Sequence, residues 1–164
     1  MLLFSVPGLH RPVTTAHKIE TFFKTRRAFA VGCATKTNSR QADMKVLLVE
    51  DNLPMREFIK GALTTVPDSE LVFETSGHTE ARQWLNDNPA GWDVAIVDLF
   101  LTEGNGFRIL KDCAARLAHQ KVVVMTNYAG SQVEDRVMAE GADAFFEKSS
   151  DFASLINYLK QLVA

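Results

Sequence analysis

The chain has 164 residues, of which 46% are hydrophobic and 23% are charged, as is typical of a globular protein with one domain. No apolar stretch is long enough to span a membrane, and the two cysteines, Cys33 and Cys113, lack metal-ligand or disulfide spacing, so we expect a cytoplasmic protein. The formal net charge of −2 divides into +5 over residues 1–43 and −7 over residues 44–164. The acidic second part argues against nucleic-acid binding through that domain.

Residues 1–43 differ in composition from the remainder of the chain. They contain seven Lys and Arg residues against two Asp and Glu, together with Pro7, Gly8 and Pro12. We predict a mostly disordered basic N-terminal extension. An organelle transit peptide, or upstream sequence that is not normally translated, is the alternative interpretation. The first strong strand signal begins beside Met44, so the folded domain is expected to span 44–164.

From residue 45, strand and helix patterns alternate five times. Short apolar runs rich in β-branched residues predict strands at 45–50, 70–75, 93–98, 121–126 and 142–147. Apolar residues at helical spacing predict helices at 53–66, 79–88, 106–118, 131–140 and 151–163. Asn52 is expected to cap the first helix, and Ser150 or Asp151 the last.

This alternation predicts an α/β fold with right-handed crossovers and helices on both faces of a parallel sheet. For five strands we predict a flavodoxin-like, doubly wound parallel sheet with strand order 2-1-3-4-5. In that order the first and third strands are neighbours, and their connections leave on opposite faces of the sheet. The crevice between these connections is where open α/β sheets place their chemistry.

Polar residues follow the predicted strands at this edge: Glu50 and Asp51, then Asp98, Thr126 and Lys148. Three carboxylates in one crevice repel one another unless a cation lies between them, and hard oxygen ligands in this number suit Mg²⁺. We predict that Asp98 is a nucleophile that becomes phosphorylated. Taken singly, each of these residues has a structural explanation, such as a helix cap or a solvated charge. Their convergence on one crevice points to a functional site.

Four segments carry a resemblance to a known family. They are VLLVEDN at 46–52, VAIVDLFL at 94–101 with Gly106 beyond it, VVVMT at 122–126 and GADAFFEK at 141–148. In this order and spacing they resemble the receiver domain of bacterial two-component response regulators, over residues 45–164. The resemblance implies that Asp98 accepts a phosphoryl group from a histidine kinase or phosphotransfer protein.

The same resemblance implies the metal ligands. Asp51 and Asp98 match the direct Mg²⁺ ligands, Glu50 matches a ligand that acts through water, and Phe100 matches the residue that supplies a backbone carbonyl. Glu50 replaces the commoner aspartate, a frequent variant that leaves metal binding plausible. Thr102 stands where many members have proline, which would leave the loop after Asp98 less rigid.

The remaining matches concern the phosphoryl group and the output. Lys148 matches the lysine that pairs with the phosphate, and Thr126 and Phe145 match the switch pair. Asn127 replaces a small residue and would narrow access to Asp98, and Ser149 replaces the proline usual after the lysine.

The sequence ends at Ala164 without a DNA-binding or enzymatic domain, so a stand-alone receiver is expected. Its signal would leave through the surface formed by the helix at 131–140, the strand at 142–147 and the last helix. The expected occupant of that surface is a downstream protein or a second copy of the chain.

Two other functions remain open from the sequence. One is a receiver-shaped scaffold that binds partners without phosphorylation, although the intact acidic set argues against it. The other is an aspartyl-nucleophile phosphatase of the haloacid dehalogenase type. That class needs a second acid two residues after the nucleophile, where this chain has Phe100.

Overall fold

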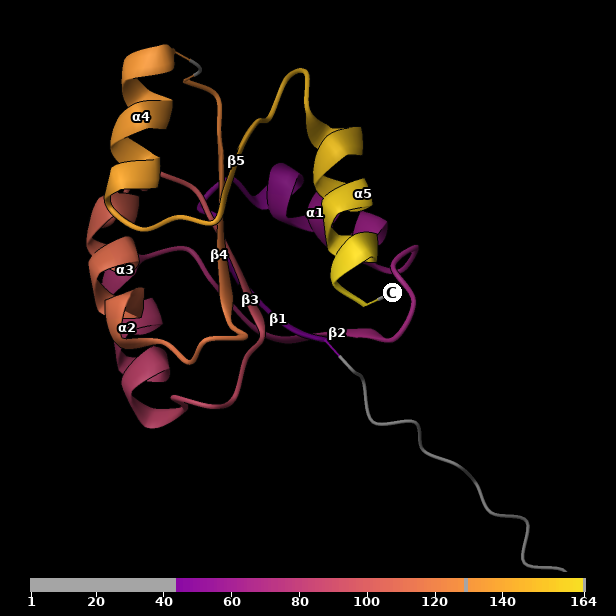
Figure 1. Cartoon of the computed structure of the whole chain (residues 1–164), viewed down its shortest axis with the longest axis horizontal. Coiled ribbons are helices and arrows are strands. Elements are labelled where there is room, and N and C mark those ends of the chain that lie inside the picture. Colours follow the sequence, from indigo (N-terminus) through magenta and orange to yellow (C-terminus); the bar gives the residue numbers. More distant parts are fainter. Residues whose placement is uncertain (1–43, 129, 164) are drawn as a thin grey trace, which may run out of the picture. The chain divides into compact units, whose positions relative to one another are not determined.

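A five-stranded parallel sheet forms the centre of the computed structural model, which describes residues 44–128 and 130–163 (Figure 1). Its strands are β1 (Met44–Val49), β2 (Ser69–Thr75), β3 (Val94–Val97), β4 (Lys121–Thr126) and β5 (Ala144–Glu147). They pair in the order β2-β1-β3-β4-β5, which confirms the predicted topology. The predicted basic extension at 1–43 lies outside the described residues.

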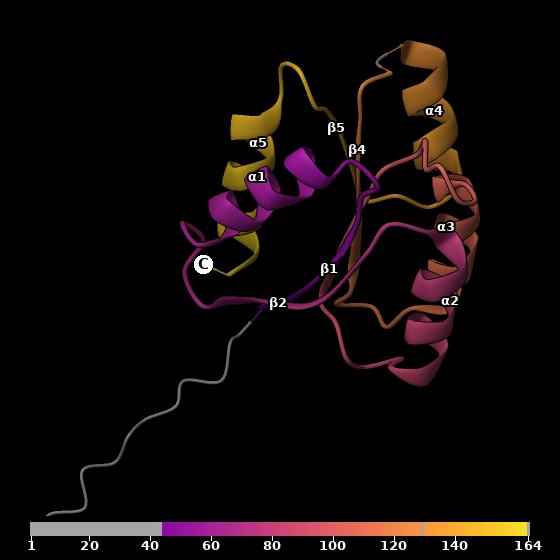
Figure 2. The same ribbon diagram turned by 180° about the vertical axis from the view of Figure 1, so that it is seen from behind.

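Helices cover both faces of this sheet. They are α1 (Leu53–Leu63), α2 (His78–Asp87), α3 (Gly106–Asp112), α4 (Ser131–Ala139) and α5 (Phe152–Leu162). Figures 1 and 2 show α1 and α5 on one face and α2, α3 and α4 on the other, as the predicted doubly wound fold requires. None of the helices in the described part of the chain is long and apolar enough to cross a bilayer.

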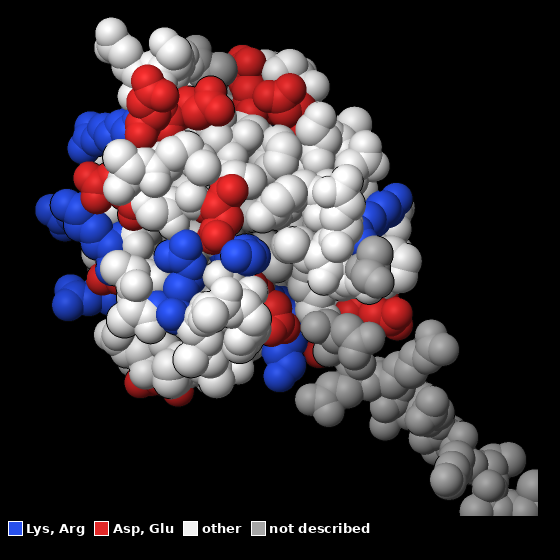
Figure 3. Space-filling view, in the orientation of Figure 1, with Lys and Arg blue, Asp and Glu red and all other residues white. Residues whose placement is uncertain are grey.

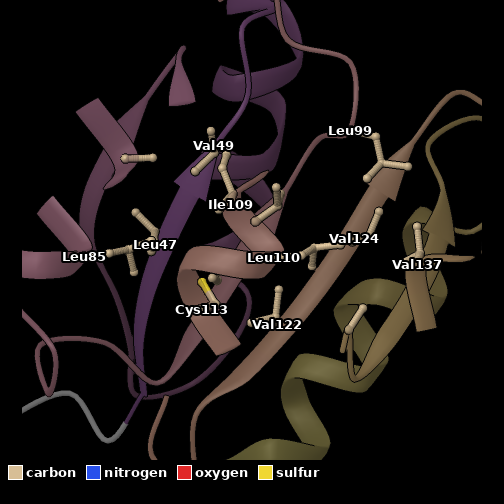
Figure 4. Packing of buried hydrophobic residues seen from close by; sticks show 14 of the residues in the cluster. Leu47, Val49, Leu85, Leu99, Ile109, Leu110, Cys113, Val122, Val124 and Val137 are labelled. Atoms are coloured by element: carbon tan, nitrogen blue, oxygen red, sulfur yellow. The ribbon is translucent and has the colours of Figure 1, made fainter. Parts of the chain in front are cut away.

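The side chains of each strand point alternately to the two faces of the sheet, and this divides the core into two layers. Leu47 and Val49 of β1 pack in a cluster with buried residues of α2, α3 and α4, part of which Figure 4 shows. Val46 and Leu48 point to the opposite face and pack against α1 and α5. Because successive strand residues point to opposite faces, a strand covered on both sides is apolar at every position, which explains the continuous apolar run of β3.

A polar side chain caps the first helix, whereas the side-chain cap predicted for the last helix does not form. Asn52 caps α1 as predicted, since its Oδ1 accepts a hydrogen bond from the backbone N–H of Met55 at 2.9 Å. Asp151 occupies the N-cap position of α5, but its carboxylate accepts the backbone N–H of Glu147 at 3.1 Å. Asp151 therefore ties the loop between β5 and α5 to the end of β5.

The helix predicted at 106–118 is shorter than expected. It ends at Asp112, and a 3-10 turn (Cys113–Ala115) leads to an extended Arg116. The Arg116 guanidinium donates a hydrogen bond to the Gly141 carbonyl at 2.8 Å and pairs with Asp143 at 2.9 Å. These contacts hold the chain away from a further helical turn, so Leu117, which the helical pattern placed inside, is 46% exposed.

Gly106 and Gly61 provide a test of local packing. A Cβ at Gly106 would lie 2.3 Å from the Asp98 carbonyl oxygen and 2.6 Å from the Leu99 Cα, whereas a Cβ at Gly61 in α1 meets nothing within 4 Å. We expect Gly106→Ala to lower the free energy of unfolding by roughly 1–3 kcal/mol through overpacking. Gly61→Ala should raise it by about 0.5–1 kcal/mol, because alanine favours the helix. Urea denaturation of both variants measures the contrast, and a stabilising Gly106→Ala would contradict the close packing at the start of α3.

Candidate functional site

A buried lysine joins two buried carboxylates at the edge where the strands end. The Lys148 Nζ lies 2.7 Å from Glu50 Oε2 and 2.7 Å from Asp98 Oδ2. The three side chains are 3%, 2% and 8% exposed, respectively. Charges this deeply buried are tolerated when they are paired, so each group depends on the others.

The sheet register brings these residues together. Val49 pairs with Val97, so Glu50 and Asp98 leave neighbouring strands side by side, and the Asp98 N–H donates to the Val49 carbonyl at 2.9 Å. On the other side of β4, the Lys148 N–H donates to the Thr126 carbonyl at 2.9 Å. Backbone hydrogen bonds therefore continue past the last strand residues and fix where the functional side chains begin.

The second oxygen of each buried carboxylate accepts a backbone hydrogen bond. Glu50 Oε1 accepts from Asn52 N–H at 3.2 Å, and Asp98 Oδ1 accepts from Phe100 N–H at 3.3 Å. Burial raises the pKa of Glu50 above its ordinary value, although its hydrogen bond to Lys148 acts in the opposite direction. The ammonium group therefore has to offset the cost of desolvating this carboxylate.

Asp51 is half-buried and receives its hydrogen bonds from the loop after β3. Its Oδ2 accepts the Thr102 backbone N–H at 2.8 Å and also the Thr102 hydroxyl. Burial acts to raise the pKa of Asp51, but the two hydrogen bonds from Thr102 outweigh it and hold the pKa below its ordinary value. Asp51 therefore remains ionised at neutral pH.

The donor set fits a small hard cation. Carboxylate oxygens of Glu50, Asp51 and Asp98 lie within 4.8 Å of one another. They border a cleft of about 350 Å³, which leaves room for water to complete a coordination shell. Lys148 supplies one positive charge against three carboxylates, so a divalent cation such as Mg²⁺ would balance the negative charge that remains.

All the residues predicted for metal binding and phosphoryl chemistry line this cleft, together with neighbours that the prediction left out. The lining consists of Glu50, Asp51, Asn52, Met55, Asp98, Phe100, Thr126, Asn127, Tyr128 and Lys148. The outer surface at this edge is also acidic. Figure 3 shows Asp and Glu side chains gathered along the top of the molecule, where β4 and β5 end in Figure 1.

An aromatic pair stands at the rim of the cleft. The rings of Phe100 and Tyr128 have centroids 4.3 Å apart, and the two residues are 49% and 60% exposed. Tyr128 was not among the predicted site residues. Its position two residues after Thr126 was the available signal, but the sequence did not show that its ring would contact that of Phe100.

The predicted switch residues lie on the same side of the sheet. Thr126 is fully buried, and its hydroxyl oxygen accepts the Tyr128 N–H at 3.4 Å. Phe145 is opposite Val124 in the register and packs half-buried against the cluster on the side of α2, α3 and α4. Phe145 is not part of the cleft lining, so any role for it in switching would pass through the core.

Comparison with known proteins agrees with this geometry. Residues 46–160 match the family profile of the response regulator receiver domain. The chain is 26% identical over 122 residues to the DNA-binding transcriptional activator DevR/DosR of Mycobacterium tuberculosis (strain ATCC 25618 / H37Rv), covering 74% of this chain and 55% of that protein. It is 32% identical over 105 residues to the virulence transcriptional regulatory protein PhoP of Salmonella choleraesuis (strain SC-B67), covering 64% of this chain and 45% of that protein. The chain thus spans about half the length of these two relatives.

Solved structures share the fold. The signal receiver domain of a DNA-binding response regulator from Colwellia psychrerythraea 34H superposes with a TM-score of 0.65 at 25% identity, over 74% of this chain and 98% of that one. A LuxR-family two-component response regulator from Aurantimonas sp. SI85-9A1 gives a TM-score of 0.65 at 22% identity, over 73% of this chain and 84% of that one. The family match over residues 46–160, well over half of the chain, shows that the chain belongs to the response regulator receiver domain family.

Proposed function

We propose that this chain is a phosphoacceptor signalling module in which Asp98 takes a phosphoryl group from a histidine kinase or a phosphotransfer protein. The observation that carries the proposal is the placement of Lys148 Nζ, 2.7 Å from both Asp98 and Glu50, in the cleft that also contains Asp51. A nucleophilic carboxylate, a cation for the phosphoryl oxygens and further oxygen ligands are the groups that such a transfer needs. The role is regulatory, since the chain would catalyse only its own phosphorylation and dephosphorylation.

In the transfer, a carboxylate oxygen of Asp98 attacks the phosphorus atom of a phosphohistidine. The new O–P bond forms as the N–P bond breaks, and the imidazole nitrogen of the donor keeps the electron pair. Asp51 and Asp98 would hold Mg²⁺ directly, with Glu50 acting through water and Phe100 through its carbonyl, and the ion would neutralise charge on the phosphoryl oxygens. Lys148 would move its hydrogen bond from the Asp98 carboxylate to a phosphoryl oxygen.

The output would begin at Thr126. Its hydroxyl accepts a hydrogen bond from Tyr128 N–H and keeps its own hydrogen for donation to a phosphoryl oxygen. Movement of Thr126 toward Asp98 would open space on the same side of the sheet, into which the half-buried Phe145 could turn. That rotation would alter the surface formed by α4, β5 and α5, the docking surface we propose for a downstream protein or a second copy of the chain.

Phosphorylation of Asp98 can be measured directly. With acetyl phosphate and Mg²⁺, intact-mass measurement should show one added phosphoryl group, and Asp98→Asn should abolish it because the nucleophile is gone. Asp135→Asn, an exposed change in α4, is the matched control and should leave the labelling intact. Asp51→Asn should slow the reaction because it alters a metal ligand, and EDTA should slow it because it removes the ion. A label on another residue would refute the assignment, absence of any label would favour the scaffold, and steady turnover of a phosphate ester would favour a phosphatase.

The buried charge cluster predicts a change in stability that the metal reverses. Lys148→Met leaves Glu50 and Asp98 buried without their cation, so the free energy of unfolding should fall by roughly 3–5 kcal/mol. MgCl₂ should stabilise this variant more than the wild type, since the ion supplies the missing positive charge. Urea denaturation with and without MgCl₂ provides the measurement. Lys160→Met, at an exposed position of α5, is the control and is expected within about 0.5 kcal/mol of wild type. A stability of Lys148→Met equal to that of the control would show that the cluster is not coupled.

The proposed switch predicts a long-range response. Backbone NMR spectra recorded with beryllofluoride and Mg²⁺, a mimic of the phosphoryl group, should show shifts that extend from the loops around Asp98 into α4 and β5. Asp98→Asn should show none of these shifts, because it cannot hold the mimic. Shifts confined to the loops around Asp98 in the wild type would contradict the coupling through Thr126 and Phe145.

A further inference from the structure

Thr102 makes two hydrogen bonds to Asp51. Its backbone N–H, at 2.8 Å, and its hydroxyl both donate to the same carboxylate oxygen, Oδ2. Two donors on one oxygen occupy the lone pairs with which that oxygen would bind a cation. The double contact needs both a backbone N–H and a side-chain hydroxyl at position 102, and Thr102 supplies the two.

The loop that presents Thr102 is held from α2. The Glu103 carboxylate accepts the Thr79 hydroxyl at 2.6 Å and the Thr79 backbone N–H at 3.3 Å, and the Glu103 carbonyl accepts the His78 N–H at 3.1 Å. Gly104 follows with a φ of +89°, and a Cβ there would lie 2.4 Å from the His78 Cβ. The donors of Thr102 are therefore positioned by backbone and side-chain contacts outside the cleft.

Mg²⁺ and Ca²⁺ differ in how they bind carboxylates, so the two hydrogen bonds to Asp51 Oδ2 affect the two ions differently. Ca²⁺ takes six to eight oxygen ligands and accepts carboxylates through one or both oxygens, whereas Mg²⁺ requires an octahedral shell with short bonds and keeps several waters. A carboxylate whose Oδ2 is occupied by two donors offers only Oδ1 to an ion. Coordination through Oδ1 alone suits Mg²⁺, which needs only one oxygen from each carboxylate. It denies Ca²⁺ the second oxygen, Oδ2, with which it could bind Asp51 through both oxygens.

We propose that Thr102 is a positioning residue that restricts Asp51 to coordination through one oxygen and thereby favours Mg²⁺ over Ca²⁺ at this site. The proposal rests on the metal binding that we propose for the function and adds a source of selectivity to it. Thr102 acts through Asp51 and does not itself need to touch the ion.

Metal titrations without a phosphodonor test the proposal. Isothermal titration of the full chain with MgCl₂ and, separately, with CaCl₂ gives the ratio of the two dissociation constants. Thr102→Val keeps the backbone N–H and the branched shape but removes the hydroxyl, so the preference for Mg²⁺ should fall roughly two- to tenfold, the range that corresponds to the loss of one ordinary hydrogen bond. Thr102→Ser keeps the hydroxyl and should retain the wild-type ratio.

The outcomes separate this proposal from the proposed function. Wild-type binding of Mg²⁺ with an unchanged ratio in Thr102→Val, or an equal loss of both ions, would overturn the role of Thr102 and leave the phosphoacceptor function standing. Failure of the wild type to bind either ion would overturn both. Thermal unfolding in EDTA checks that the variants fold, and Thr102→Ala provides a second variant without the hydroxyl should Thr102→Val not fold.

Discussion

The ammonium group of Lys148, buried between Glu50 and Asp98, is the interaction on which the rest of the site depends. Two carboxylates at this depth would repel each other and would be costly to ionise without a cation between them. The lysine lies on the far side of β4 from Asp98, so the pairing exists only if β1, β3, β4 and β5 are in register. The charge cluster and the sheet therefore depend on each other.

The two apolar layers give this cluster a rigid support. A slip by one residue would turn every side chain of a strand to the opposite face of the sheet, so it would disrupt the packing of both layers. The polar residues of the cleft begin where the strands end. A rigid sheet thus carries the acidic residues, and the loops that follow it decide how open the cleft is.

The loops that follow the strands make further contacts around the cleft. Phe100 and Tyr128 place an aromatic pair at the rim, and Thr102 contacts Asp51 from a segment held by Glu103 against α2. Each of these contacts joins two connections that follow different strands. The loops after β1, β3 and β4 therefore act together on one cleft, although they are separated by long stretches of sequence.

The sequence by itself determined the five strands and the acidic, threonine and lysine residues of the cleft, because these depend on local patterns: apolar runs of strand length, helical spacing between them, and polar residues where strands end. Only the tertiary structure decided the features that depend on contacts between distant residues. Arg116 ends α3 early by bonding to Gly141, and Phe58, which fits the helical pattern of α1, is 56% exposed and packs with its ring tilted against that of Phe152. Likewise, nothing near Thr102 in the sequence indicates that both its donors reach Asp51, since that contact exists only after β1 and β3 have paired.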